Sequence, residues 1–260
     1  MRELHLFAGI GGGILGGMLC GHTPVCAVEV SEFCRRVLLQ RQRDGRLPKF
    51  PIWSDIKSFD GKPWRGHVDA ICGGFPCTDL SCAKRNAAGI FGPQSSLWFE
   101  MLRIVREVRP RYVLVENSPM LVSRGLCTVL EGLAESRYNA EWMVLSASDI
   151  GAPHIRERLW ILAQQQEEKD DPDAAGGRGD AIAFQEGIRT KISVPRWNWD
   201  SRLLDACKFW ESGQPGICRM DDGISTFVEQ FRAIGNAQVP LCAAAAWKVL
   251  YNRINADGRV

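Results

Sequence analysis

A glycine-rich turn near the N-terminus constrains the fold more than any other feature of this sequence. Residues 3–8 are apolar enough to form a short buried strand, and the run FAGIGGG carries the chain out of it. Glycines are needed where a backbone turns tightly and comes close to a ligand, and Gly11, Gly13 and Gly16 have the spacing of a dinucleotide-binding turn. A helix-like apolar run at 14–19 follows. The chain therefore begins as a predicted strand, turn and helix.

The same alternation continues over the first 163 residues. Further strands are expected at 25–30, 68–72, 112–115, 141–146 and 158–163, and helices at 32–43 and 97–108. A further helix is expected at 237–254, after a stretch without strong periodicity. Alternating short strands and helices predict an α/β fold with a mostly parallel sheet covered on both faces. Ligands of such sheets bind at the carboxyl ends of the strands.

Composition narrows the class of protein without identifying a partner. The chain has 260 residues, 45% of them hydrophobic and 24% charged, which fits one large domain or one domain with a small appendage. No stretch approaches the roughly 20 apolar residues of a membrane span, and no signal-peptide pattern opens the chain, so we expect a cytoplasmic protein. With a net charge of +2, nucleic-acid binding would need a local basic surface.

The ten cysteines show no CxxC pair and no zinc-type spacing with histidine. Most are expected to be reduced, buried and apolar in character. No metal site is expected.

Three chemically distinctive residues follow predicted strands. Glu29 ends the second strand at the distance from the glycines where a carboxylate can accept hydrogen bonds from both ribose hydroxyls, which fits a nicotinamide cofactor or S-adenosylmethionine. Cys77, in GGFPCTDLS, precedes a long loop at 81–94; a lone cysteine is more often structural, but a loop beside a nucleophile suggests closure over a substrate. Glu116, in VLVENSP, is either a solvated strand end or a third group at this edge.

A pair of arginines precedes the last predicted strand. Arg156 and Arg158 are two residues apart, so on an extended segment both side chains point the same way. The simple alternative is an exposed, charged strand start. Two guanidinium groups on one side suit anionic recognition better.

Five motifs in this order resemble the cytosine-C5 DNA methyltransferases: FAGIGGG, GGFPC, ENS, the paired arginines and IGNAQVP. The resemblance covers residues 3–163 and about 231–254. It implies a Rossmann-like S-adenosylmethionine-dependent methyltransferase fold. The implied divisions are a catalytic and cofactor-binding domain at 1–163, a small inserted target-recognition region at 164–231, and a segment at 232–260 that completes the catalytic domain.

The resemblance also assigns roles to single residues. Cys77 would attack C6 of a flipped-out cytosine, Glu116 would engage N3 and the exocyclic amine, and Arg158 with Arg156 would orient the base and the catalytic groups. S-adenosylmethionine would donate the methyl group to C5. Glu29 would bind its ribose, and the other implied cofactor contacts are Phe7, Gly9, Ile10, Gly11, Val30, Asp55, Ile56, Gly74, Pro76, Leu97, Asn236 and Ala237. Asp55 has the alternative of being a turn aspartate.

The expected partner is double-stranded DNA, bound by a monomer in a prokaryotic or phage-like setting, as in restriction-modification. The predicted DNA contacts are Ser81, Lys84, Arg85, Arg189, Lys191, Arg196 and Arg202. Trp197 and Trp199, between these cations, fit base contacts and a small core equally well. Three alternatives stay open: a cytosine methyltransferase acting on tRNA, a catalytically silent nucleic-acid-binding relative, and, on the glycine turn alone, a nicotinamide dehydrogenase.

Overall fold

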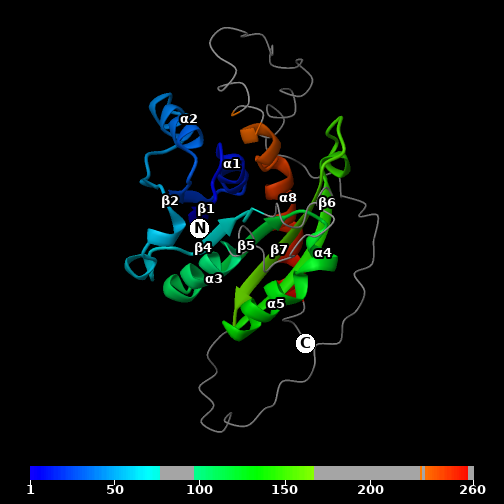
Figure 1. The fold of residues 1–260 in the computed structure, drawn as a ribbon. Coiled ribbons are helices and arrows are strands. Elements are labelled where there is room, and N and C mark those ends of the chain that lie inside the picture. Colours follow the sequence, from blue (N-terminus) through cyan, green and yellow to red (C-terminus); the bar gives the residue numbers. More distant parts are fainter. Residues whose placement is uncertain (77–96, 167–228, 230–231, 257–260) are drawn as a thin grey trace.

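A mostly parallel sheet forms the centre of the protein (Figure 1). The structure, a computed structural model, describes residues 1–76, 97–166, 229 and 232–256. Within these residues the strand order is β3-β2-β1-β4-β5-β7-β6. The pairs from β3 through β5 are parallel, whereas β7 runs antiparallel to both β5 and β6. The predicted α/β class with a mostly parallel sheet is confirmed.

The helices and strands have the following bounds. The strands are β1 (Arg2–Leu6), β2 (Thr23–Val28), β3 (Ile52–Trp53), β4 (Ala70–Gly73), β5 (Tyr112–Asn117), β6 (Tyr138–Ser146) and β7 (Glu157–Gln165). The α-helices are α1 (Gly12–Leu19), α2 (Glu32–Arg43), α3 (Leu97–Val108), α4 (Leu121–Arg124), α5 (Leu126–Glu135) and α8 (Pro240–Ala256). Short 3₁₀ turns are η1 (Ile56–Ser58), η2 (Lys62–Trp64) and η5 (Ala147–Ile150).

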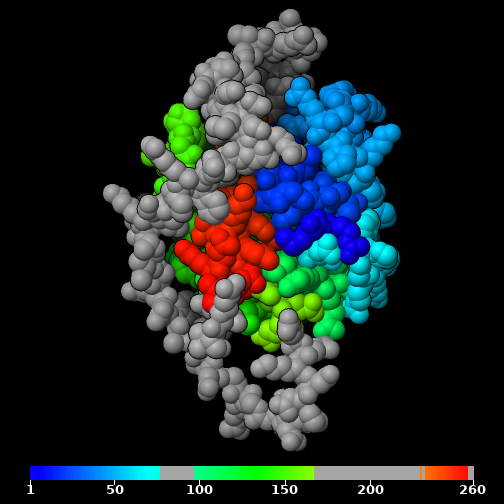
Figure 2. All heavy atoms as spheres, turned by 180° about the vertical axis from the view of Figure 1, so that it is seen from behind, coloured from blue at the N-terminus to red at the C-terminus, as the bar shows by residue number. Residues whose placement is uncertain are grey.

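Helices cover both faces of the sheet. Successive side chains of a strand point to opposite faces, and apolar side chains on both faces need to be covered. On β1, Leu4 and Leu6 face α3 and α5, where Trp98 and Val129 complete the same core. The opposite face is covered by α8 and α1, and Figure 2 shows the red C-terminal helix beside the blue N-terminal segment. The two ends of the described chain thus pack against each other and against the sheet.

The bounds of two helices were predicted as observed, whereas α4, α5 and β3 were not predicted. The helices at 32–43 and 97–108 have the predicted limits, whereas β5 extends to Asn117 and β6 begins at Tyr138 because both pair with the long strand β7. The last helix starts at Pro240, not at 237, since proline fits the first turn of a helix but not its interior. Among the described residues, no helix is long and apolar enough to cross a membrane.

Candidate active site

The glycine turn after β1 takes a conformation that most side chains avoid. Phe7, Gly9 and Gly11 have positive φ angles of 55°, 53° and 90°, in the left-handed region that glycine tolerates best. A Cβ atom on Gly12 would lie 2.0 Å from the backbone oxygen of Gln238, and one on Gly13 would lie 2.3 Å from its Oε1. These two glycines therefore make room for the chain's own C-terminal segment as well as shaping a turn.

Glu29 lies directly after β2, with 8% of its surface exposed. Its Oε2 accepts a hydrogen bond from the Gly9 amide at 2.7 Å, and its Oε1 accepts one from the Ser31 amide at 2.8 Å. Because each carboxylate oxygen can accept a second bond, the group has capacity left for two hydroxyl donors. Glu29 and the glycine turn it contacts thus fit the ribose end of a nucleoside cofactor.

Other residues assigned to the cofactor lie near this edge but differ in exposure. Val30 is 74% exposed, and Ile56 is buried. Asp55 accepts a hydrogen bond from the Lys57 amide at 2.9 Å and caps the N-terminus of η1, which is the geometry of a turn aspartate. Leu97 is the first residue of α3. The role of Asp55 toward adenine remains a prediction.

The Glu116 carboxyl group near the end of β5 is the centre of the site. Its Oε1 forms an ion pair with Arg158 Nε at 3.0 Å, and Gln238 Nε2 donates toward its Oε2 at 3.5 Å. Desolvation by burial raises the pKa of Glu116, while Arg158, Arg156 and the Gln238 amide oppose that rise. The structure thus brings together a carboxyl group with increased proton affinity and a guanidinium on the neighbouring strand.

The two paired arginines contact different parts of the site. Whereas Arg158 binds Glu116 directly, Arg156 donates through Nη2 to the backbone oxygens of Gly235 and Ala237, at 2.6 and 2.9 Å. Arg156 therefore ties the C-terminal segment to the start of β7. The sequence did not indicate this backbone role.

The segment before Cys77 is held at the same edge. Asn117 is buried and donates through Nδ2 to the carbonyl of Phe75 at 3.1 Å. A Cβ on Gly74 would lie 2.5 Å from Glu116 Oε2, so any other residue here would displace the Glu116 carboxyl group from this position. Pro76 is the last described residue of the motif. Cys77 itself lies outside the described residues, as do the predicted DNA contacts Ser81, Lys84, Arg85, Arg189, Lys191, Arg196 and Arg202.

A small cavity joins the glycine turn to Glu116. Its volume is about 30 Å³, and its lining includes Phe7, Gly9, Gly74, Glu116, Asn236, Ala237 and Gln238. Residues implied for the cofactor and for catalysis therefore share one cavity. Gln238 was not singled out from the sequence, although it belongs to the quoted run IGNAQVP.

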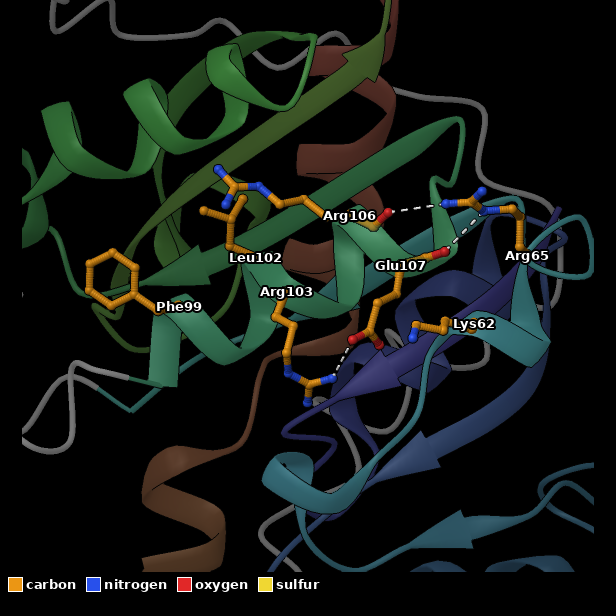
Figure 3. A pocket seen from close by; sticks show the side chains of 7 residues that line it. All are labelled: Lys62, Arg65, Phe99, Leu102, Arg103, Arg106 and Glu107. Carbon is orange, nitrogen blue, oxygen red and sulfur yellow. Dashed lines mark hydrogen bonds and ion pairs between the residues drawn. The ribbon is translucent and has the colours of Figure 1, made fainter.

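A larger cavity of about 590 Å³ lies along α3 and contains none of the predicted site residues (Figure 3). Arg103 and Arg65 converge on Glu107 there: Arg103 binds its carboxylate at 2.8 Å, and Arg65 binds its backbone oxygen at 3.1 Å. Arg106 pairs with Glu135. The arginines of this cavity are therefore already engaged within the protein.

A buried polar cluster that packs against α1 at Gly17 was also missed. Glu3 lies 3.0 Å from His5 Nε2 and 2.7 Å from His22 Nδ1, with Cys72 Sγ at 3.5 Å. Burial alone would raise the pKa of Glu3, but its bonds to His22 and His5 lower it to about 2. Burial raises the pKa of the Cys72 thiol well above its ordinary value. The alternation of polar Glu3 and His5 with apolar Leu4 was the available signal.

The sequence of this chain matches the sequence model of a family described as C-5 cytosine-specific DNA methylase over residues 1–193. The chain belongs to this family. Methyltransferase M.CviJI of Paramecium bursaria Chlorella virus IL3A, a type II enzyme, is 35% identical over 163 residues, which are 62% of this chain and 42% of that protein. Type II methyltransferase M.HhaI of Haemophilus parahaemolyticus is 31% identical over 166 residues, 62% and 48% of the two chains. The chain thus aligns with less than half of these curated relatives.

Solved structures of similar fold support the architecture of this chain. The Entamoeba histolytica methyltransferase EhMeth has a TM-score of 0.62 at 14% identity, with 98% of each chain covered. Spodoptera frugiperda DNMT2, in a mutant form, has a TM-score of 0.51 at 19% identity, covering 63% of this chain and 50% of that one. At such identities the likeness concerns the fold alone, and that fold is the expected Rossmann-like methyltransferase fold.

Proposed function

We propose that this protein is a DNA (cytosine-5-)-methyltransferase that transfers a methyl group from S-adenosylmethionine to C5 of a flipped-out cytosine in double-stranded DNA. The strongest support is the arrangement around Glu116. This residue forms an ion pair with Arg158 and lies close to Gly74, just after β4, in a cavity that the glycine turn also lines. These residues come from motifs far apart in the sequence, in a member of the cytosine-specific methylase family.

Glu116 has the environment that proton donation to cytosine N3 needs. A general acid works best when its pKa approaches the working pH, and burial moves the pKa of Glu116 in that direction. The protonated carboxyl group would donate to N3 and accept from the exocyclic amine. Arg158, which is bound to Oε1 of Glu116, would fix the orientation of the carboxyl group. Together with Arg156, it would supply positive charge that favours a nearby thiolate.

The proposed reaction runs through a covalent bond between Cys77 and the base. The thiolate adds to C6, and the displaced electron pair of the C5–C6 double bond becomes available at C5 as N3 takes a proton. When bound, S-adenosylmethionine would supply an electrophilic methyl group to C5, and S-adenosylhomocysteine would be the leaving group. A base then removes the C5 proton, the double bond reforms and the thiolate leaves. Because C5 and C6 are stacked inside a duplex, the cytosine must first flip out, which costs a few kcal/mol.

The cofactor would lie along the ends of β1 and β2. Glu29 retains acceptor capacity for the ribose hydroxyls, and the amino-acid end would run along Phe7, Gly9, Ile10 and Gly11. Asn236 and Ala237 line the cavity that leads to Glu116. The packing of α8 against α1 supports assigning 232–260 to the catalytic domain, with 164–231 as the target-recognition region.

A duplex that contains 5-fluorocytosine tests the covalent step, because fluorine at C5 cannot leave as a proton. We expect a denaturation-resistant complex that requires both S-adenosylmethionine and Cys77. Cys77→Ala should abolish it, and Glu116→Gln should slow its formation by about 100-fold or more. Cys127→Ala, which alters an exposed cysteine, is the matched control. A complex that survives Cys77→Ala would contradict the mechanism.

The nucleic-acid substrate needs a separate experiment. Labelled methyl incorporation into duplex DNA, with little into tRNA, is expected; the reverse would favour the tRNA alternative, and incorporation into neither would favour a silent relative.

Arg196→Ala combined with Arg202→Ala should weaken duplex binding and lower its salt dependence. Arg36→Ala combined with Arg43→Ala, on α2, serves as the control pair. Equal binding by the Arg196/Arg202 variant would contradict the assigned contacts.

We propose that the protein acts as a monomer in the cytoplasm, in a prokaryotic or phage-like setting.

A further inference from the structure

Gln238 contacts both halves of the site. Its Nε2 lies 3.5 Å from Glu116 Oε2 and would lie 3.2 Å from a Cβ on Gly74. Its Oε1 and backbone oxygen lie against Gly13 and Gly12. One residue therefore connects the glycine turn, the segment between β4 and Cys77, and the largely buried Glu116 carboxyl group.

We propose that Gln238 is a positioning residue that orients the Glu116 carboxyl group for cytosine N3 and couples it to the glycine turn. This inference rests on the proposed function. Arg158 on β7 binds Glu116 Oε1, and Gln238, in the segment before α8, donates toward Oε2. Two partners on different elements define the plane of a carboxyl group, which one partner alone does not. The distance of 3.5 Å is long, as catalytic hydrogen bonds often are before a substrate binds.

The segment that carries Gln238 is itself fixed. Arg156 binds the carbonyls of Gly235 and Ala237, and α8 begins at Pro240. The paired arginines therefore act on the two oxygens of Glu116 by different routes: Arg158 binds one directly, and Arg156 holds the backbone that brings Gln238 to the other. This arrangement explains why two arginines at this spacing serve one carboxyl group.

An amide suits a carboxyl group that gains and loses a proton. Its NH₂ can donate to either oxygen of the ionised carboxylate and to the carbonyl oxygen of the protonated acid, so the contact can persist in both protonation states. A cation at this point would hold the carboxylate ionised, and a second carboxylate would oppose ionisation. Within the part of the chain that the structure describes, the other ionisable groups around Glu116 are Arg158, Arg156, Cys242 on α8, and His5 and Cys72, which line the same cavity.

Two nearly isosteric variants separate positioning from simple packing. Gln238→Met keeps the length and removes the amide, and it should lower kcat at least about tenfold because misorientation of a catalytic group is costly. The KM for S-adenosylmethionine should stay within about threefold. Gln238→Glu brings a second carboxyl group to Glu116, so the pH dependence of kcat should move to higher pH by about one unit. Gln40→Met, on the exposed face of α2, should change neither quantity.

A purely structural role predicts a different pattern: a lower melting temperature and a higher KM, with an unmoved pH profile. That pattern, or a kcat for Gln238→Met within twofold of the unmutated protein, would overturn the proposal. If the unmutated protein transfers no methyl group, the proposed function fails, and the Glu116 carboxyl titration followed by ¹³C NMR still tests the contact. Gln238→Met should then raise the pKa of Glu116, and an unchanged titration would refute the contact.

Discussion

The pKa values of two largely buried carboxyl groups, Glu3 on β1 and Glu116 on β5, shift in opposite directions because of their partners, although only β4 separates the two strands. Desolvation acts on both, but Glu3 is bonded to His5 and His22, and its pKa falls to about 2. Glu116 faces a single direct guanidinium partner, and its pKa rises. The same residue type thus becomes a structural anion at one point and a group able to hold a proton at another.

Replacing Glu3 by Gln should destabilise the fold by about 3 kcal/mol at pH 7, because the two histidines lose their anionic partner inside the protein. A carboxyl group with a lowered folded pKa stabilises above its ordinary value of 4.5 and loses that contribution as the pH falls toward about 2. The difference from the unmutated protein should therefore shrink over that window. Urea unfolding at several pH values measures this difference.

Glu32→Gln is the control variant, because Glu32 forms an exposed pair with Arg36. It should change stability by less than about 1 kcal/mol. An equal loss in both variants would contradict a stabilising role of the Glu3 cluster.

At the scale of elements, the glycine turn and the segment before α8 are fitted to each other. The backbone oxygen of Gln238 occupies the space beside Gly12 where a side chain would begin. The motif FAGIGGG is therefore shaped by two demands, the turn after β1 and the close approach of a segment more than 200 positions later.

Gly12→Ala should lower the free energy of unfolding by about 1–3 kcal/mol, since the added methyl group meets backbone atoms that cannot rotate away. Gly235→Ala is the matched control, because its Cβ would meet nothing within 4 Å and its φ angle is ordinary. Denaturant titration of both variants is the measurement. Equal stability of the two would show that the C-terminal segment adjusts freely to the turn.

At the scale of the whole molecule, α8 completes the sheet's second face. Trp247 is 4% exposed and packs edge-on against His22 at 4.9 Å and Tyr112 at 5.9 Å. Helix α8 is thus part of the core on this face of the sheet, and its Trp247 packs against His22, a member of the buried cluster around Glu3.

Trp247→Ala should cost about 3–5 kcal/mol of folding free energy, the range for removing a buried aromatic side chain. Trp53→Ala, which alters a tryptophan that is 47% exposed, should cost about 1 kcal/mol or less. Thermal unfolding followed by circular dichroism compares them. Similar losses of folding free energy would mean that Trp247 on α8 contributes no more to stability than an exposed tryptophan does.

Local features of the sequence determined the α/β class, the bounds of α2 and α3, and the residue types of the motifs, because periodicity and turn chemistry are properties of adjacent residues. They also grouped Glu29 and Glu116 at one edge, since parallel strands end together. The ends of β5 and β6 were not predictable in this way, because pairing with β7 extends them.

Only the tertiary structure decided which side chains meet. Arg158 was predicted near Glu116, but the separate task of Arg156 depends on where the backbone of Gly235 and Ala237 runs. Gln238 lies 122 positions from Glu116, and no local pattern encodes a contact across that separation. The sequence alone thus determined the chemistry available at this edge, whereas chain packing decided its geometry, because each partner of Glu116 arrives on a different element.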